Sequence, residues 1–228
     1  MLTKRKKLSK KEIKEDKLVE LYYKAYGYFD ENKSQVFTYA GVLVVIVLAA
    51  IWYVNHKNQQ NNQAGVQLAS VMSLYDNGAY LEAIEGQAGT NVLGLKKIVE
   101  QYGSTENGET AKIFLANSYN RLGKIDEAYK YYKDYDGSIG MFQAAAYAGQ
   151  AGYYADKNDY TKAAELYIKA SRVSPNDVLN ADYLLHAGIN YLAADQKTEA
   201  KNAFEKIKKD YDTSSEASKV NQYLAQVD

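Results

Sequence analysis

The sequence predicts an all-α protein in which one N-terminal transmembrane helix is followed by a solenoid of paired helices and a C-terminal closing helix. Three observations lead to this prediction. Residues 36–54 are apolar on every helical face, the apolar residues after them recur with helical period, and one pattern of small and aromatic residues recurs at intervals of 35 and 37 residues. The chain of 228 residues contains one proline, Pro175, so little interrupts long helices.

The first segment, residues 1–35, is expected to be a cytoplasmic, basic and partly amphipathic helical segment. Ser9 and Glu12 fit a capping box that opens a helix. An apolar stripe then recurs at spacings of three and four, made of Leu18, Leu21, Tyr22, Ala25 and Phe29. The segment either sets membrane topology, contacts anionic lipid or RNA, or docks on a membrane partner. Nucleic acid is not the partner we expect.

Residues 36–54, VFTYAGVLVVIVLAAIWYV, are predicted to be a transmembrane helix. No charged side chain occurs between Lys33 and Lys57, and eleven of the nineteen residues are Val, Leu, Ile or Phe. As a helix, the segment would span roughly 28 Å, about one bilayer core. Aromatic residues suited to the headgroup level lie at both ends: Phe37, Tyr39, Trp52 and Tyr53. The alternatives are a buried soluble helix and a cleaved signal peptide, but the long lead and the bulky end of the segment disfavour cleavage.

Charge predicts the orientation of this helix. Residues 1–35 carry ten Lys or Arg and six Asp or Glu, whereas Lys57 is followed by no Lys or Arg until Lys96. The excess of positive charge before the helix places the N-terminus in the cytoplasm and the C-terminal part across the membrane.

The polar run of residues 55–63, NHKNQQNNQ, is predicted to be a tether, because it has no apolar side chain to bury. His56 lies in this run and is expected to be interfacial or solvated, not a ligand. The remaining residues, 64–228, are enough for one sizeable core.

A repeated pattern in residues 64–228 predicts pairs of antiparallel helices. Each copy has a small residue, an aromatic residue three later, a turn, an alanine, and an aromatic residue four after that. The three copies are Ala116, Tyr119, Ala128 and Tyr132; Ala151, Tyr154, Ala163 and Tyr167; and Gly188, Tyr191, Ala200 and Phe204. The interval is close to the roughly 34-residue period of the tetratricopeptide repeat, and Pro175 falls where that repeat ends its second helix.

This pattern predicts the boundaries of the repeats. Regular repeats are expected at about 109–140, 144–175 and 181–212. An irregular first repeat at 64–104 contains Gly78, Tyr80 and Ala83, a loop or broken helix at 85–94, and an additional helix at 95–102. Residues 214–227 are expected to form the closing helix that a solenoid needs, with Ser214 or Ser215 as its cap.

The order of parts resembles the single-pass tetratricopeptide-repeat proteins of the bacterial cell envelope, of which the ancillary subunit of the Sec translocon is one kind. The shared features are a basic lead (KRKKLSKKEIKEDKLVELYYKAY), one span, a polar tether, and a helix-pair array with an irregular first repeat. The resemblance implies an inner-membrane protein with its C-terminal domain in the periplasm. It also implies partners among translocon subunits, periplasmic folding factors and exported proteins.

The sequence offers little for catalysis. The chain has no Cys, and His186 has no second His or carboxylate cluster near it in sequence. No phosphate-binding loop, metal-ligand spacing or nucleophile elbow occurs. We therefore predict no catalytic residue, no metal site, no cofactor and no enzymatic activity.

A partner-binding groove is the remaining candidate site, because the first helices of such repeats line a concave surface. The repeat register assigns to this surface Met72, Tyr75, Asn117, Asn120, Arg121, Gly152, Asp156, Leu185, Ile189 and Leu192. The polar members would hydrogen-bond an extended peptide or its carboxylate, and the apolar members would hold side chains. The alternative is that these residues are solvated or pack against the closing helix.

These features favour a membrane-anchored protein-interaction scaffold that is associated with the Sec translocon and passes exported proteins to periplasmic folding factors. The alternative is a structural scaffold for envelope biogenesis or division that acts by oligomerisation. The oligomeric state and the identity of the partner do not follow from the sequence.

Overall fold

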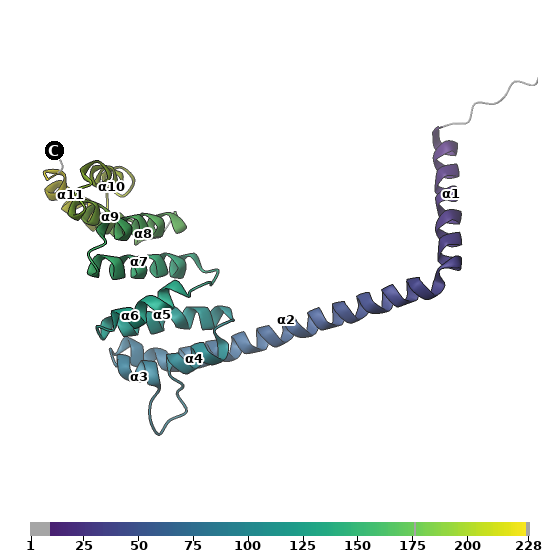
Figure 1. Ribbon diagram of the computed structural model, residues 1–228, viewed down its shortest axis with the longest axis horizontal. Helices are drawn as coiled ribbons and strands as arrows, with labels where there is room; N and C mark the ends of the chain where they lie inside the picture. The colour runs from purple at the N-terminus through teal and green to yellow at the C-terminus, as the bar shows by residue number, and fades with distance from the viewer. Residues whose placement is uncertain (1–9, 176, 227–228) are drawn as a thin grey trace, which may run out of the picture. The chain divides into compact units, whose positions relative to one another are not determined.

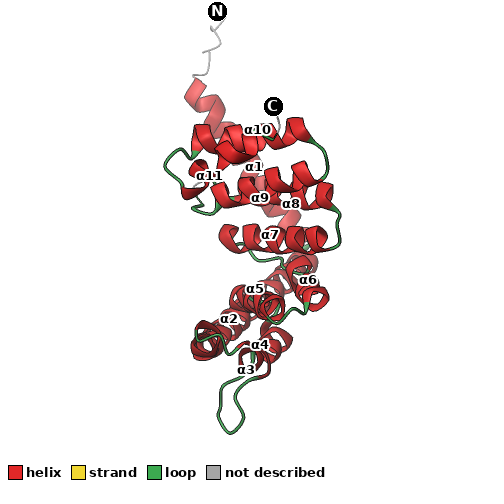
Figure 2. Ribbon diagram, turned by 90° about the vertical axis from the view of Figure 1, so that its left-hand side faces the viewer, coloured by secondary structure: helices red, strands yellow, loops and turns green. Residues whose placement is uncertain are grey.

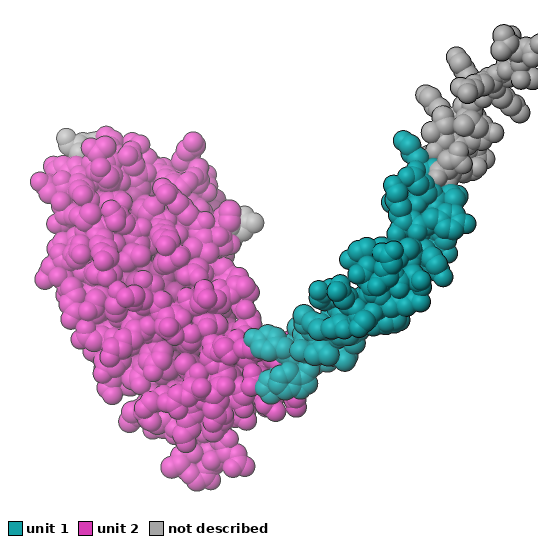
Figure 3. All heavy atoms as spheres, turned by 45° about the vertical axis from the view of Figure 1, so that its right-hand side comes forward, with its two compact units in different colours: residues 1–56 teal, residues 57–228 magenta. Residues whose placement is uncertain are grey.

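The computed structural model describes residues 10–175 and 177–226, with side chains from residue 17 on, and this part of the chain is helical with no β-strand. Contacts divide the chain into two compact units, residues 1–56 and 57–228 (Figure 3). The all-α prediction is confirmed.

Unit 1 contains α1, Lys10–Glu31, and the first part of α2, Lys33–Asp76. Asn32 separates the two helices, and its side-chain Nδ2 donates to the Tyr28 carbonyl at 2.9 Å, where the chain bends (Figure 1). The predicted capping box cannot be assessed, because Ser9 lies outside the described residues and the side chain of Glu12 is not described.

The apolar segment 36–54 lies within α2, which is long and apolar enough to cross a membrane. None of its most apolar window is buried by the rest of the chain. The predicted interface residues are all exposed: Phe37, Tyr39, Trp52 and Tyr53. The His56 ring stacks on Trp52 with centroids 5.4 Å apart.

The segment 55–63, predicted as a tether, is helical over its whole length and continues α2. The run contains no Gly or Pro to interrupt a helix, and its polar groups find partners in unit 2. Asn107 donates its backbone N–H to Asn61 Oδ1 at 2.8 Å and its Nδ2 to the Asn61 carbonyl at 2.9 Å. The first helix of the irregular repeat is therefore the end of α2, not a separate helix beginning at residue 64.

Unit 2 stacks its helices in chain order (Figure 2). Three regular pairs follow one another: α5 (Glu106–Arg121) with α6 (Ile125–Lys133), α7 (Gly140–Asp156) with α8 (Tyr160–Val173), and α9 (Asn180–Ala193) with α10 (Lys197–Asp210). The end of α2 and the short α3 (Tyr80–Glu85) form a fourth pair that precedes them. The regular pairs fall within a few residues of the predicted repeats.

All four pairs use the same three-residue turn. Its middle residue has a positive φ, at Gly78, Gly123, Asn158 and Asp195. The residue after it donates its N–H to a carbonyl five positions earlier, as in Lys124 N to Tyr119 O at 2.9 Å. This bond satisfies a free carbonyl at the end of the first helix, and the left-handed residue reverses the chain. The position is occupied each time by Gly, Asn or Asp, which adopt the left-handed conformation at a low cost in free energy.

The irregular part contains a loop and one additional helix. A loop at residues 86–94 follows α3, and α4 covers Leu95–Tyr102. A Cβ at Gly94 would overlap the backbone of Glu85 and Gly86, so only glycine fits where the two ends of the loop meet. The additional helix then packs on α5, with Leu95 and Ile98 fully buried.

The buried side chains form three clusters along the stack. The first cluster lies under α2, α3, α4 and α5, the next lies around α7 and α8, and the last lies under α9 and α10. In the pair α9 and α10, a Cβ at Gly188 would overlap the ring of Phe204, which is fully buried. The closing helix α11 (Ser215–Leu224) buries Val220 in this cluster. Ser214 caps it, because the Ala217 N–H donates to Ser214 Oγ at 3.2 Å.

Candidate functional site

A groove of about 730 Å³ lies on one face of unit 2. It is lined by residues from the end of α2, the end of α5, the middle of α7 and the first half of α9. The lining residues are Tyr75, Asn117, Asn120, Arg121, Tyr132, Ala145, Ala148, Gly149, Asp182, Tyr183 and His186. Its volume is in the range of about 300–1,000 Å³ that is usual for ligand sites.

Four of the residues predicted for a groove line it together: Tyr75, Asn117, Asn120 and Arg121. The other predicted residues lie elsewhere. Leu185 is buried in the core cluster that contains Phe204 and Val220, and two further predicted residues, Ile189 and Leu192, pack against that cluster. They are core residues because α10 and α11 cover this side of α9.

The remaining predicted residues also lie outside the lining of the groove. Met72 is partly buried against the first core cluster. Asp156 ends α7 and is exposed, and Gly152 is partly buried within the same helix. The groove therefore contains the predicted residues of α5 and Tyr75 of α2, but none of those predicted on α7 and α9.

Hydrogen-bond donors are concentrated on the last turns of α5. Tyr132 donates its hydroxyl to Asn117 Oδ1 at 2.6 Å, which occupies the amide oxygen and leaves the Asn117 amide nitrogen as the free end. Asn120 and Arg121 are exposed, and neither side chain makes a hydrogen bond or an ion pair with another described residue. This side of the groove therefore presents unpaired donors and one unpaired positive charge.

The opposite side carries an acceptor and aromatic rings. His186 lies 3.6 Å from Asp182, one helical turn away, and its ring stacks on Tyr167 with centroids 5.2 Å apart. The His186 side chain is 47% exposed. The Asp182 carboxylate, also 44% exposed, can accept further hydrogen bonds from a ligand.

Tyr132 and Tyr183, which line the groove, and Tyr167, which stacks on His186, remain neutral donors at physiological pH. Burial raises the pKa of Tyr132. Burial and the nearby Asp177 and Asp182 charges raise the pKa of Tyr183 to about 12, and burial and the charges of Asp182 and Asp156 raise the pKa of Tyr167 to about 12. Buried, un-ionised rings of this kind are rigid walls that can still donate a hydrogen bond.

Small residues of α7 form the floor of the groove. Ala145, Ala148 and Gly149 line it, and a Cβ at Gly149 would overlap the ring of Tyr132. The ring of Tyr132 therefore lies against Gly149, while the small side chains of Ala145 and Ala148 leave room for a backbone to approach closely. The donors on α5 and the Asp182 acceptor match the carbonyl and N–H groups of an extended peptide. The arrangement suits peptide binding.

Sequence reasoning missed Asp182, Tyr183, His186 and the three small residues of α7. It assigned one register to every first helix, but the groove is lined by the last turns of α5 and by the first half of α9. The signal that was present is the pair Asp182 and His186, which are four residues apart and therefore share a helix face.

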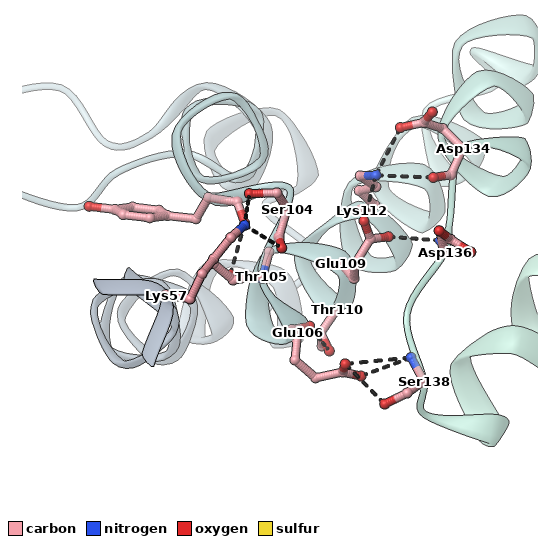
Figure 4. A network of polar contacts seen from close by, with 12 residues as sticks. Lys57, Ser104, Thr105, Glu106, Glu109, Thr110, Lys112, Asp134, Asp136 and Ser138 are labelled. Atoms are coloured by element: carbon pink, nitrogen blue, oxygen red, sulfur yellow. Dashed lines mark hydrogen bonds and ion pairs between the residues drawn. The ribbon is translucent and has the colours of Figure 1, made fainter. Parts of the chain in front are cut away.

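A second polar cluster lies at the start of α5 and holds three segments together (Figure 4). Lys112 Nζ contacts Glu109 Oε1 at 2.8 Å and Asp134 Oδ2 at 2.9 Å, and Glu109 Oε2 accepts from the Asp136 N–H at 2.9 Å. Lys57 Nζ donates to the Ser104 carbonyl at 3.1 Å.

The lysine in this cluster is almost completely buried, with a side-chain exposure of 10%. Burial alone would lower the pKa of Lys112, but hydrogen bonds and charges from Glu109 and Asp134 outweigh burial and raise the pKa. Both lysines of the cluster and the carboxylates of Glu106, Glu109 and Asp134 each have a partner, so we interpret the cluster as structural.

Among the described residues, no group of three or more His, Cys, Asp or Glu is arranged to hold a metal ion. Comparison of the chain with models of known families, with curated proteins and with solved structures gave no match. Its function must therefore be inferred from its own residues and geometry.

Proposed function

We propose that this chain is a membrane-anchored scaffold whose array of tetratricopeptide repeats binds an extended segment of another protein. The observation that carries the proposal is the groove, in which the unpaired Asn120 and Arg121 face a floor of small residues and the Asp182 carboxylate. A hydrogen bond to a charged group contributes about 1.5–3 kcal/mol, so these donors are strong candidates for affinity.

Two features support the assignment to tetratricopeptide repeats. Four helix pairs share one turn geometry, and the small residues of the first helices and the alanines of the second helices are buried where the helices of a pair meet. Close approach of paired helices needs small side chains at these positions.

The anchor is α2, which crosses a bacterial inner membrane with the basic N-terminus in the cytoplasm and the array in the periplasm. The exposed apolar segment and the charge difference between its flanks support this placement. Because the chain has no cysteine, single-cysteine variants test the topology: Ser70→Cys should react with a membrane-impermeant maleimide in spheroplasts, and Lys17→Cys should react only after lysis. The reverse pattern would overturn the orientation.

The partners that fit this location are translocon subunits, a periplasmic folding factor, or exported proteins in transit. The first experiment is photo-crosslinking in cells from Asn120 in the groove and from Tyr39 at the start of the apolar segment. Capture of exported chains or a folding factor at Asn120, and of translocon subunits at Tyr39, is the expected result.

A binding measurement separates the groove from the rest of the surface. The full chain in nanodiscs should bind a fluorescent unfolded polypeptide, and Arg121→Ala should weaken binding by about tenfold or more, since one charged hydrogen bond is worth at least 1.4 kcal/mol. Lys130→Ala removes the same charge from an exposed position on α6 that does not line the groove and should leave binding unchanged.

Equal effects of the two substitutions would contradict a specific groove. If both crosslinking positions capture only copies of the chain itself, or envelope-assembly and division components, the alternative function as an oligomerising structural scaffold takes its place.

A further inference from the structure

Helix α1 carries a wide apolar and aromatic face that no other described residue covers. Leu18 is 61% exposed, Leu21 65% and Tyr22 64%, and all three lie on the stripe that continues to Phe29. The opposite face carries Lys17, Glu20, Lys24 and Glu31, and Lys24 Nζ pairs with Glu20 Oε1 at 2.7 Å. The helix therefore has one face suited to water and one face that needs an apolar surface.

The end of this face lies beside the start of the apolar segment of α2. The rings of Phe29 and Phe37 meet edge to face with centroids 5.9 Å apart. Lys33 and Asp30 form an ion pair across the bend at Asn32, at 2.5 Å. Because Phe37 is at the edge of the apolar segment, the end of α1 is at the depth where a bilayer changes from hydrocarbon to headgroups.

The side chains on α1 suit that depth. Four tyrosines, Tyr22, Tyr23, Tyr26 and Tyr28, are between 58% and 68% exposed, and none of their hydroxyls bonds another described residue. A tyrosine ring prefers the apolar side of the headgroup layer while its hydroxyl remains hydrated. The sequence before Glu12 adds six Lys or Arg and no acidic residue, and basic residues near an anionic leaflet are attracted to it.

We propose that α1 lies in the headgroup layer of the membrane that α2 crosses, with the face that carries Leu18, Leu21 and Tyr22 toward the acyl chains. The inference rests on the proposal that α2 spans the membrane. It adds a lipid-binding element to the anchor, because α1 then lies along the membrane surface.

The absence of cysteine makes a direct test possible. Tyr22→Cys, Lys24→Cys and Val45→Cys each receive a spin label in the full chain, reconstituted in nanodiscs of phosphatidylethanolamine and phosphatidylglycerol. Collision rates with oxygen, which concentrates in lipid, and with a water-soluble nickel chelate then give the depth of each label. Positions 22 and 24 are both exposed, so neither variant threatens folding.

The proposal expects a severalfold higher ratio of oxygen to nickel accessibility at position 22 than at position 24, with position 45 deepest. Replacing phosphatidylglycerol by phosphatidylcholine should reduce the difference between 22 and 24. Equal, water-like values at 22 and 24 with a deep label at 45 would overturn the inference and leave the span intact. Protection of position 22 from both reagents would overturn it in favour of a protein contact, and a water-exposed label at 45 would overturn the span itself.

Discussion

The two parts of α2 differ in how their apolar residues are arranged around the helix. In residues 36–54 every side chain but that of Val36 is exposed, although most are apolar. Further along the same helix, Ala64, Leu68 and Val71 are buried at spacings of four and three, and the polar residues Gln67 and Ser70 lie between them. The first part has no polar face to turn toward water, and the second part has one.

The spacing of the apolar residues accounts for this difference in which faces of the helix are covered. Where they occur on all faces, no other described residue covers them, and the helix is long and apolar enough to cross a membrane. Where they recur at three and four, one stripe packs on the array and the rest of the helix remains hydrated. Four experiments test this comparison. They are described in order of decreasing expected effect.

The largest effect should come from Lys112→Met, because the array, unlike the apolar part of α2, contains a buried ion pair. The substitution leaves the Glu109 carboxylate, which is 11% exposed, without its lysine partner. It should therefore lower the free energy of local unfolding of α5 by about 3–5 kcal/mol. Hydrogen exchange by mass spectrometry on the full chain in detergent measures it. The control is Lys206→Met, which breaks an exposed pair with Asp210 and should leave the stability of the array almost unchanged. Equal losses would mean that the pair at Lys112 is no more than a surface contact.

The same truncation in the two parts of α2 should have opposite outcomes. Leu68 is 8% exposed, so Leu68→Ala should destabilise the packing of α2 on the array by about 3 kcal/mol. Leu48 is 60% exposed, so Leu48→Ala should leave hydrogen exchange in the array unchanged and reduce membrane insertion by only about 0.5 kcal/mol. A loss of protection in the array after the change at Leu48 would show that the two parts are not independent.

Alkaline pH should unfold the array through its buried tyrosines. Tyr167 and Tyr183 have pKa values raised to about 12 in the fold, so their contribution to stability is complete below pH 10 and is lost as pH rises through 12. Each ionises first in the unfolded chain, and stability then falls by about 1.4 kcal/mol per pH unit per tyrosine.

Tyr167→Phe should therefore make the alkaline transition shallower by one proton, as measured by circular dichroism together with tyrosinate absorbance. The control is Tyr22→Phe, which changes an exposed ring of unit 1 and should not alter the transition. An unchanged slope in both variants would show that Tyr167 titrates alike in the folded and unfolded chain.

The smallest effect concerns the polar segment between the two parts of α2. Asn61→Ala removes the acceptor of the Asn107 N–H and should reduce protection at the start of α5 by about 1 kcal/mol. Its neighbour Asn62 is exposed and makes no hydrogen bond with another described residue, so Asn62→Ala should have no effect. If Asn61→Ala also leaves the protection of α5 unchanged, the segment acts as the simple tether that the sequence predicts.

Much of the array could be predicted because its signals are local. The closing helix and its serine cap, the additional helix at 95–102 and the turns of the helix pairs all depend on residues within one or two turns of each other. The polar run 55–63 was predicted as a tether because its composition shows nothing to bury. Its partner, Asn107, lies 46 residues away in sequence, and no local pattern identifies such a contact.

The sequence alone determined which faces of the helices are apolar, where pairs of helices turn back, and which segment is long and apolar enough to cross a membrane, because periodicity and composition carry these properties. Only the tertiary structure decided which residues share the groove. Tyr75, Asn117 and His186 lie on three different helices and are far apart in sequence, yet they line one groove. Packing between helices brings them together, as where the ring of Tyr132 on α6 lies against Gly149 on α7, and no local pattern in the sequence identifies such packing.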